Sequence, residues 1–208
     1  MDFADVMRRR RMVRNYTDEP VPREAVDRIV ACGRKAPSGG FSQGVRFVVV
    51  TEPDTRRRIA ELANEAEYVV AAGGEPWITR APVHIVVAMR EGDYHDRYTE
   101  PDKLKLTGQE VEWRVPWWWV DAGKAVMLLL LAAVDEGLGA GLFGLVGDEN
   151  DRLRELLGIP GDCEIVGVVT VGHPAPEPLR ERTKAAIRRR RRPLEEVVRW
   201  EHYDRPPR

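Results

Sequence analysis

The alternation of apolar and polar positions along this 208-residue chain predicts a single domain, residues 1–208, that contains both helices and strands. Three short runs are predominantly apolar, as in strands buried on both faces: 47–50, 83–88 and 164–171. Four segments carry apolar residues at helical spacing: 3–11, 24–35, 55–66 and 148–157. A further strand is expected to begin near Leu142.

The segment 121–136 is predicted to be a helix that is apolar on nearly every side. Such a helix must be buried all round, which favours a core helix that also forms a dimer interface. Its longest apolar run, Ala125–Val134, is ten residues long, too short to span a bilayer. The first residues contain no apolar run typical of a signal peptide. We therefore expect a cytoplasmic protein without a membrane partner.

The segment 90–119 interrupts this pattern with a polar stretch rich in aromatic and cationic residues. A connection of this length is typical of a lid, a binding loop or a cover over a neighbouring subunit. Tyr98, Lys103 and Lys105 are the candidate substrate contacts within it. The alternative is that this segment has a structural role only and that its tryptophans pack to stabilise a dimer. The tail from Pro174 onwards is rich in proline and charge and is expected to be extended.

The basic residues are concentrated in two arginine clusters, 8–14 and 188–192, although the formal net charge of the chain is only −1. A fold that brought the clusters together would bind phosphate or another compact anion, because guanidinium groups pair bidentately with such oxygens. The nearly neutral total charge argues against a general nucleic-acid-binding protein.

The sequence contains no pattern typical of a metal site, a dinucleotide-binding loop or a nucleophilic serine. No two histidines have metal-ligand spacing, so no metal site is expected. The glycine-rich segment Gly137–Gly141 follows a predicted helix rather than a strand, so it does not fit a dinucleotide-binding loop. The G-x-S-x-G motif of a nucleophilic serine is absent from the sequence.

Several motifs, taken in order, resemble the nitroreductase family of FMN-dependent NAD(P)H oxidoreductases. They are RRMVRNY (10–16), PVPREAVDRIV (20–30), APSGGFSQ (36–43), VDAGKAVMLLLLAAVDEGLG (120–139), LRELLGIPGD (153–162), VGHP (171–174) and RRRPLEEVV (190–198). No single motif is decisive, but their ordered combination over nearly the whole chain is specific. The resemblance implies a three-layer α+β fold with a mixed, mainly antiparallel sheet. It also implies an intertwined homodimer with FMN at the interface.

The resemblance also implies which residues contact FMN. The expected set is Arg10, Arg11, Met12, Arg14, Ser38, Gly39, Phe41, Gln43, Phe143, Gly144, Leu145, Arg189 and Arg191. Within this set, Arg10 and Arg191 would bind the phosphate, and Arg14 the pyrimidine side of the ring. Ser38 and Gly39 belong to a loop that the other subunit ordinarily donates. Met12 stands where the family usually has serine, and Phe41 where it often has asparagine.

The implied function is ping-pong hydride transfer from NADH or NADPH, through FMN, to a nitroaromatic, a quinone or a similar small-molecule acceptor. No catalytic side chain is required, because the cofactor carries the chemistry. Alternatives within the fold are a reductive dehalogenase, a flavin-fragmenting enzyme and a non-enzymatic flavin-binding protein. In the dehalogenating branch a hydroxyl lies near the flavin, whereas Gly141–Gly147 contains none. We therefore expect two-electron reduction of the acceptor.

Overall fold

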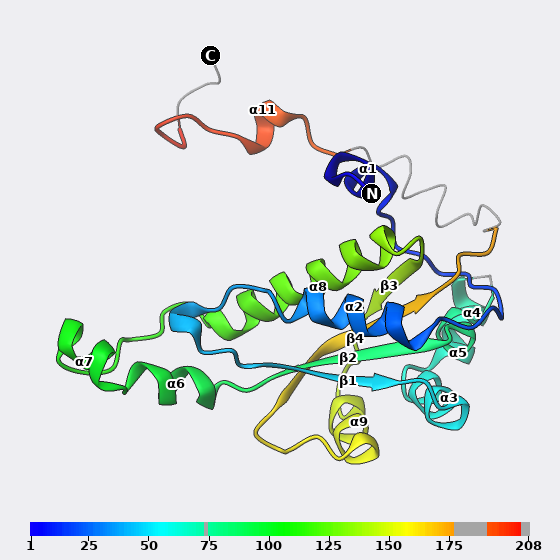
Figure 1. Ribbon diagram of the computed structural model, residues 1–208, viewed down its shortest axis with the longest axis horizontal. Helices are drawn as coiled ribbons and strands as arrows, with labels where there is room; N and C mark the ends of the chain where they lie inside the picture. The colour runs from blue at the N-terminus through cyan, green and yellow to red at the C-terminus, as the bar shows by residue number, and fades with distance from the viewer. Residues whose placement is uncertain (73–74, 177–190, 205–208) are drawn as a thin grey trace.

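The computed structural model describes residues 1–72, 75–176 and 191–204, and places a four-stranded sheet between two layers of helices (Figure 1). The strands are β1 (Val45–Val50), β2 (Val83–Met89), β3 (Gly139–Phe143) and β4 (Glu164–Gly172), in the order β1-β2-β4-β3. β2 is buried at every position, which explains why its sequence is apolar except at His84. This three-layer α+β arrangement agrees with the predicted fold class.

All strand pairings among the described residues are antiparallel, whereas a mixed sheet was expected. The parallel element is confined to an isolated bridge between Met12 and Ala140. The register pairs Val45 with Met89 at one end of the sheet. At the opposite end, Gly139 pairs with Gly172, next to the start of β2.

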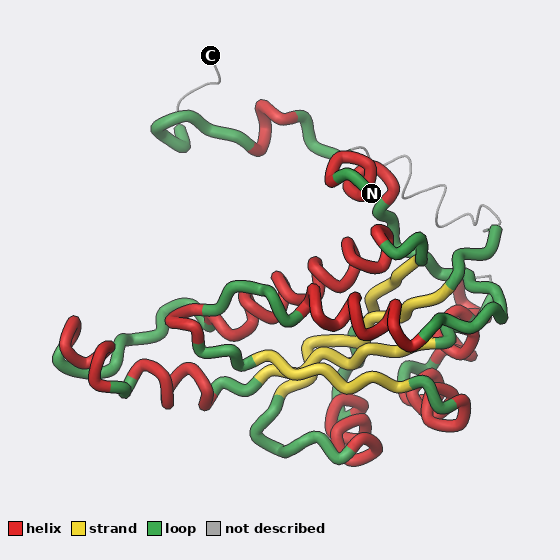
Figure 2. The backbone as a smooth tube through the Cα atoms, viewed as in Figure 1, coloured by secondary structure: helices red, strands yellow, loops and turns green. Residues whose placement is uncertain are grey.

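Helices cover both faces of the sheet (Figures 1 and 2). They are α1 (Phe3–Arg9), α2 (Arg23–Gly33), the 3₁₀ turn η1 (Gly39–Phe41), α3 (Pro53–Leu62), α4 (Glu65–Ala72), α5 (Trp77–Arg80), α6 (Gly92–Tyr98), α7 (Pro101–Thr107), α8 (Trp117–Asp135), α9 (Glu149–Leu157) and α11 (Leu194–Val197). α2 and α8 lie on one face, and α3 and α9 on the other.

α8 is the core helix of the fold. Ala122, Ala125, Leu129 and Ala133 recur at helical spacing on its buried face. A Cβ on Gly33 of α2 would lie only 2.6 Å from a Leu129 methyl group, so glycine allows these two helices to approach closely. By length and composition α8 could also cross a membrane, but more than half of it is buried inside this fold, as in core helices of soluble proteins.

The expectation that this helix is buried all round is wrong for the single chain. Trp117, Trp119, Val120 and Met127 of α8 are 39–46% exposed. Of these, Trp117, Val120 and Met127 recur at helical spacing and form an exposed apolar strip on one face of α8.

Several predicted boundaries also need correction. The predicted helix 55–66 is two helices, because Asn64 adopts a left-handed backbone with a φ of 50°. The core helix begins at Trp117, before the predicted start at Asp121. The segment 90–119 contains α6 and α7, each only seven residues long and therefore too short to show a clear helical period.

Candidate functional site

The first part of the site is the extended strip Arg10–Arg14, which is held against the start of β3. The Val13 amide donates to the Ala140 carbonyl at 2.9 Å. A Cβ on Gly141 would lie 2.5 Å from the Val13 carbonyl oxygen, so only glycine lets the strip lie this close. Val13 is buried, whereas Arg10 and Arg14 are half-buried. The strip therefore keeps two guanidinium groups at a surface fixed to the sheet.

At the other predicted FMN contacts near the strip, three side chains pack into the interior and one glycine is exposed. Met12 packs against the main core cluster, and Phe143 and Leu145 pack against the clusters beneath the sheet. Gly144 is exposed, and a Cβ placed on it would have no atom within 4 Å. The side chains of Met12, Phe143 and Leu145 therefore pack against apolar clusters, and backbone contacts of these positions with a ligand stay a prediction.

Trp77 joins the two sequence segments of this first part, and sequence reasoning missed it. The Arg14 guanidinium lies 5.7 Å from the centre of the Trp77 ring, and the Phe143 ring packs edge-on at 5.6 Å. The indole Nε1 is buried and has no hydrogen-bond partner among the described residues. Trp77 stands in a four-residue helix after Pro76, where no periodicity could signal its role.

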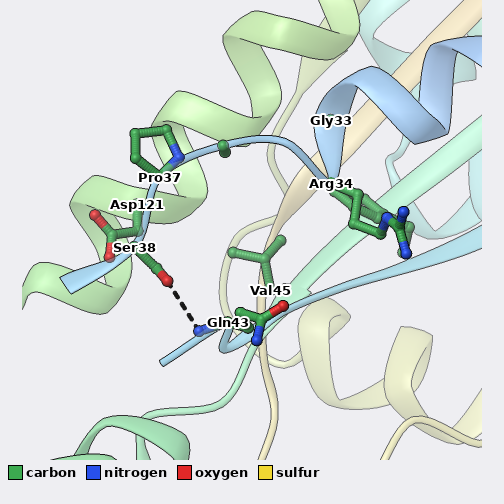
Figure 3. Close-up of a pocket in the computed structure, with 9 residues that line it drawn as sticks. Gly33, Arg34, Pro37, Ser38, Gln43, Val45 and Asp121 are labelled. Carbon is green, nitrogen blue, oxygen red and sulfur yellow. Dashed lines mark hydrogen bonds between the residues drawn. The ribbon is translucent and has the colours of Figure 1, made fainter. Parts of the chain in front are cut away.

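The second part of the site is the loop Ser38–Gln43 (Figure 3). The Gln43 amide donates to Ser38 Oγ at 3.0 Å, and the Ser42 hydroxyl donates to the Gly39 carbonyl at 2.7 Å. Ser38 and Gln43 line a cavity of about 190 Å³ together with Arg34 and Asp121. Phe41 is not part of this lining, and 73% of its side chain is exposed.

The segment 90–119, here called the cover, lies directly against this loop. A Cβ on Gly40 would lie 2.7 Å from Tyr98, which shows how closely the Tyr98 ring packs on the loop. The Lys103 ammonium lies 5.0 Å from the centre of that ring, and Arg97 Nε donates to the Gly40 carbonyl at 2.8 Å. Lys105 is exposed on α7. Two of the three predicted substrate contacts therefore border the loop.

The inside of the cover is an aromatic cluster. The Trp113 and Trp118 rings lie 6.1 and 5.9 Å from the Tyr94 ring. Trp113 and Trp118 therefore pack within this chain, and a contribution of the segment to dimer stability stays a prediction. Trp117 and Trp119 remain exposed on the first turn of α8. Among the described residues, no group of three or more His, Cys, Asp or Glu side chains is arranged to hold a metal ion.

The two parts of the site lie near opposite ends of helix α8 within one chain (Figure 1). The Gly39 amide donates to Asp121 in the second turn of α8 at 2.8 Å, whereas Arg11 shares a cavity with Val134 in its last turn. With a rise of 1.5 Å per residue, Asp121 and Val134 are about 20 Å apart along the helix. One chain therefore does not bring the arginine strip and the loop to the same place.

The predicted C-terminal arginines are only partly described. Arg189 lies outside the described residues, and Arg191 is exposed just before α11. The meeting of the two arginine clusters therefore stays a prediction.

The nitroreductase family profile matches residues 7–173 of this chain. An FMN reductase [NAD(P)H] of Bacillus subtilis is 32% identical over 175 residues, covering 79% of this chain and 63% of that protein, less than two thirds of its length. An NADH dehydrogenase of Thermus thermophilus is 27% identical and covers 96% of both chains. An iodotyrosine deiodinase of Nematostella vectensis is 28% identical, covering 95% of this chain and 74% of that protein.

A solved structure has the same fold. A nitroreductase family protein from Streptococcus pneumoniae aligns with a TM-score of 0.72 at 21% identity, and the alignment covers 96% of this chain and 100% of the other. At this identity the likeness concerns the fold alone. Because the family profile spans most of the sequence, this chain belongs to the nitroreductase family.

Proposed function

We propose that this protein binds FMN and uses NADH or NADPH to reduce a nitroaromatic compound, a quinone or a similar small molecule. The class of enzyme, an FMN-dependent NAD(P)H oxidoreductase, follows from the family and from relatives named FMN reductase and NADH dehydrogenase. When bound, FMN supplies the redox chemistry by taking electrons from the nicotinamide and passing them to the acceptor. The protein's own residues bind the cofactor, orient the reactants and set the local electrostatics.

The arginine strip is the observation that carries this proposal, and it fits FMN. Arg10 and Arg14 offer cationic donors to a phosphate and to the electron-rich edge of the ring. The open backbone at Gly144 leaves room for a flat ligand, since nothing lies within 4 Å of a Cβ placed there. The unpaired Nε1 of Trp77 is a further buried donor beside Arg14.

We further infer that the complete site needs two copies of this chain. Arg14 and the loop Ser38–Gln43 would both border the flavin ring. Within one chain, however, they lie near opposite ends of helix α8. A second copy, related by a twofold axis, would place its loop beside the first copy's arginine strip. The exposed apolar strip on α8, which includes Trp117 and Met127, provides a surface for this contact.

A mixture of two defective variants tests the shared site. We expect Arg14→Ala and Gly40→Val each to lose most reductase activity, the second because Gly40 has a φ of 58° and packs on Tyr98. A mixed dimer, however, keeps one site with both parts intact. In the co-expressed mixture, random pairing makes about half of the dimers mixed, so about a quarter of wild-type activity should return; mixed dimers purified through one affinity tag on each variant should show about half. Activity no higher than the sum of the two variants would contradict a shared site.

The cover is proposed to contact the acceptor through Tyr98, Lys103 and Lys105. We expect the double variant Lys103→Met, Lys105→Met to lower kcat/KM for anionic acceptors by about three- to fivefold, because an exposed charge contact contributes up to about 1 kcal/mol. FMN affinity should stay unchanged. Arg58→Met is the matched control, since it removes an exposed cation from α3 on the far face of the sheet. Unchanged kcat/KM for every acceptor would remove the substrate role of these lysines.

A reductive dehalogenase is the second candidate, because a deiodinase is among the relatives. The segment Gly141–Gly147, which lies where the dehalogenating branch has its hydroxyl, contains no serine, threonine or tyrosine. Halogenated phenols therefore belong in the acceptor panel, with release of halide measured beside loss of the nicotinamide. Halide release faster than nitro or quinone reduction would favour this second candidate.

A further inference from the structure

Asp121 is a buried carboxylate in the apolar helix α8, where only 1% of its surface is exposed. Its Oδ2 accepts hydrogen bonds from the Gly39 amide and the Tyr94 hydroxyl, both at 2.8 Å. Its Oδ1 accepts from Lys124 Nζ at 2.6 Å. A carboxylate at this depth requires such donors to replace its lost hydration. The side chain thus joins the loop Ser38–Gln43, the cover and the core helix.

The loop that Asp121 holds has an unfavourable backbone conformation. Gly40, Phe41 and Gln43 have φ angles of 58°, 63° and 54°. Glycine adopts this region freely, but Phe41 and Gln43 are strained there and need external contacts to hold them. Three such contacts come from outside the loop: Arg97 donates to the Gly40 carbonyl, Arg46 donates to the Gln43 carbonyl, and Asp121 accepts from the Gly39 amide.

Tyr94 connects the same oxygen to the cover. It lies on α6 with no exposed surface, and a Cβ on Gly44 would come within 2.6 Å of its ring. Burial raises the pKa of the Tyr94 hydroxyl, and the hydrogen bond to Asp121 raises this pKa further. The hydroxyl therefore remains a donor throughout the neutral range. Any movement of α6 away from α8 must break this bond at the atom that also holds Gly39.

We propose that Asp121 is a positioning residue that sets the backbone conformation of Ser38–Gln43 and couples this loop to the cover. The proposal rests on the proposed function in one respect, namely that the loop borders FMN. It assigns Asp121 no contact with the cofactor or the acceptor. A substitution of Tyr94, on the cover, should then change the backbone conformation of the loop, because both contact Asp121 Oδ2.

Hydrogen–deuterium exchange of the full-length protein, with and without FMN, tests the coupling. Asp121→Asn cannot accept from all three donors in the same way, so exchange should accelerate in residues 36–44 and in α6. β4 should keep its protection. FMN affinity should fall by about tenfold, as for loss of a hydrogen bond to a charged group, and the visible spectrum of the bound FMN should shift. Arg58→Met is the control, because it removes an exposed cation from α3 on the far face of the sheet and should leave residues 36–44 protected.

Tyr94→Phe gives a second test, which does not remove the buried charge. It keeps the ring and deletes one hydroxyl, so residues 36–44 should exchange faster although the substitution lies on α6. Unchanged exchange in residues 36–44 in both Asp121→Asn and Tyr94→Phe, or in Tyr94→Phe alone if Asp121→Asn does not fold, would overturn the proposal. Failure of the wild-type protein to bind FMN would instead contradict the proposed function, because exchange in the FMN-free protein still measures the coupling.

Discussion

Replacement of Arg10 by alanine is expected to weaken FMN binding by about tenfold or more, because a hydrogen bond to a charged group contributes about 1.5–3 kcal/mol and 1.4 kcal/mol corresponds to a decade. Arg10 is half-buried at the start of the strip that Val13 anchors to β3. The backbone that carries its guanidinium is therefore fixed to helix α1 and to the sheet. Titration of the FMN-free protein, followed by flavin fluorescence, measures the change.

Arg8→Ala is the matched control for this measurement. Arg8 belongs to the same cluster, but it forms an ion pair with Asp5 within α1 and is largely exposed. Its loss should leave FMN affinity unchanged. Arg191→Ala should weaken binding as much as Arg10→Ala if both arginine clusters bind one phosphate. Wild-type affinity in both Arg10→Ala and Arg191→Ala would show that the clusters share no phosphate.

Replacement of Gly141 by alanine is expected to lower the free energy of unfolding by about 3 kcal/mol, the upper end of the usual cost of overpacking. The added Cβ would lie 2.5 Å from the Val13 carbonyl oxygen and 3.0 Å from Thr170 Oγ1. Backbone and a buried β-strand side chain cannot both move aside easily. The strip should therefore separate from β3, and FMN affinity should fall together with stability. Urea unfolding and FMN titration measure the two effects.

Gly161→Ala provides the comparison, since a Cβ there would meet no atom within 4 Å. It should change neither stability nor FMN affinity appreciably. If Gly141→Ala behaved like Gly161→Ala, close contact between the strip and β3 would not be what positions Arg10 and Arg14.

The parts of the fold that the sequence predicted are those with an unambiguous pattern. β2 could be predicted because it is buried at all seven positions and is apolar at all of them except His84. The start of β3 was placed too late, near Leu142, because Gly139 and Gly141 are typical of a turn. In the structure these glycines are strand residues that leave space for Val13. A contact between distant segments therefore selected residues that local propensity would exclude from a strand.

In the site, too, residues that carry a local motif could be predicted, whereas residues placed by distant contacts could not. The arginine strip and the loop Ser38–Gln43 could be found because they carry a motif. Asp121 stands at the start of the predicted helix 121–136, because the regular pattern is interrupted over 90–119. The tryptophans before it are in fact helical, so Asp121 is interior and buried. Its partners Gly39 and Tyr94 are 82 and 27 residues away, a relation that only the fold reveals.

Anaerobic reduction of the FMN-loaded protein tests the central claim most directly. The purified protein, reconstituted with FMN, is mixed with NADH or NADPH without oxygen, and the visible flavin band is followed. We expect the band to bleach with at least one of the two nicotinamides and to return when a nitroaromatic compound or a quinone is added. An FMN-loaded protein whose flavin band stays unchanged with excess of either nicotinamide would contradict the assignment as an NAD(P)H oxidoreductase.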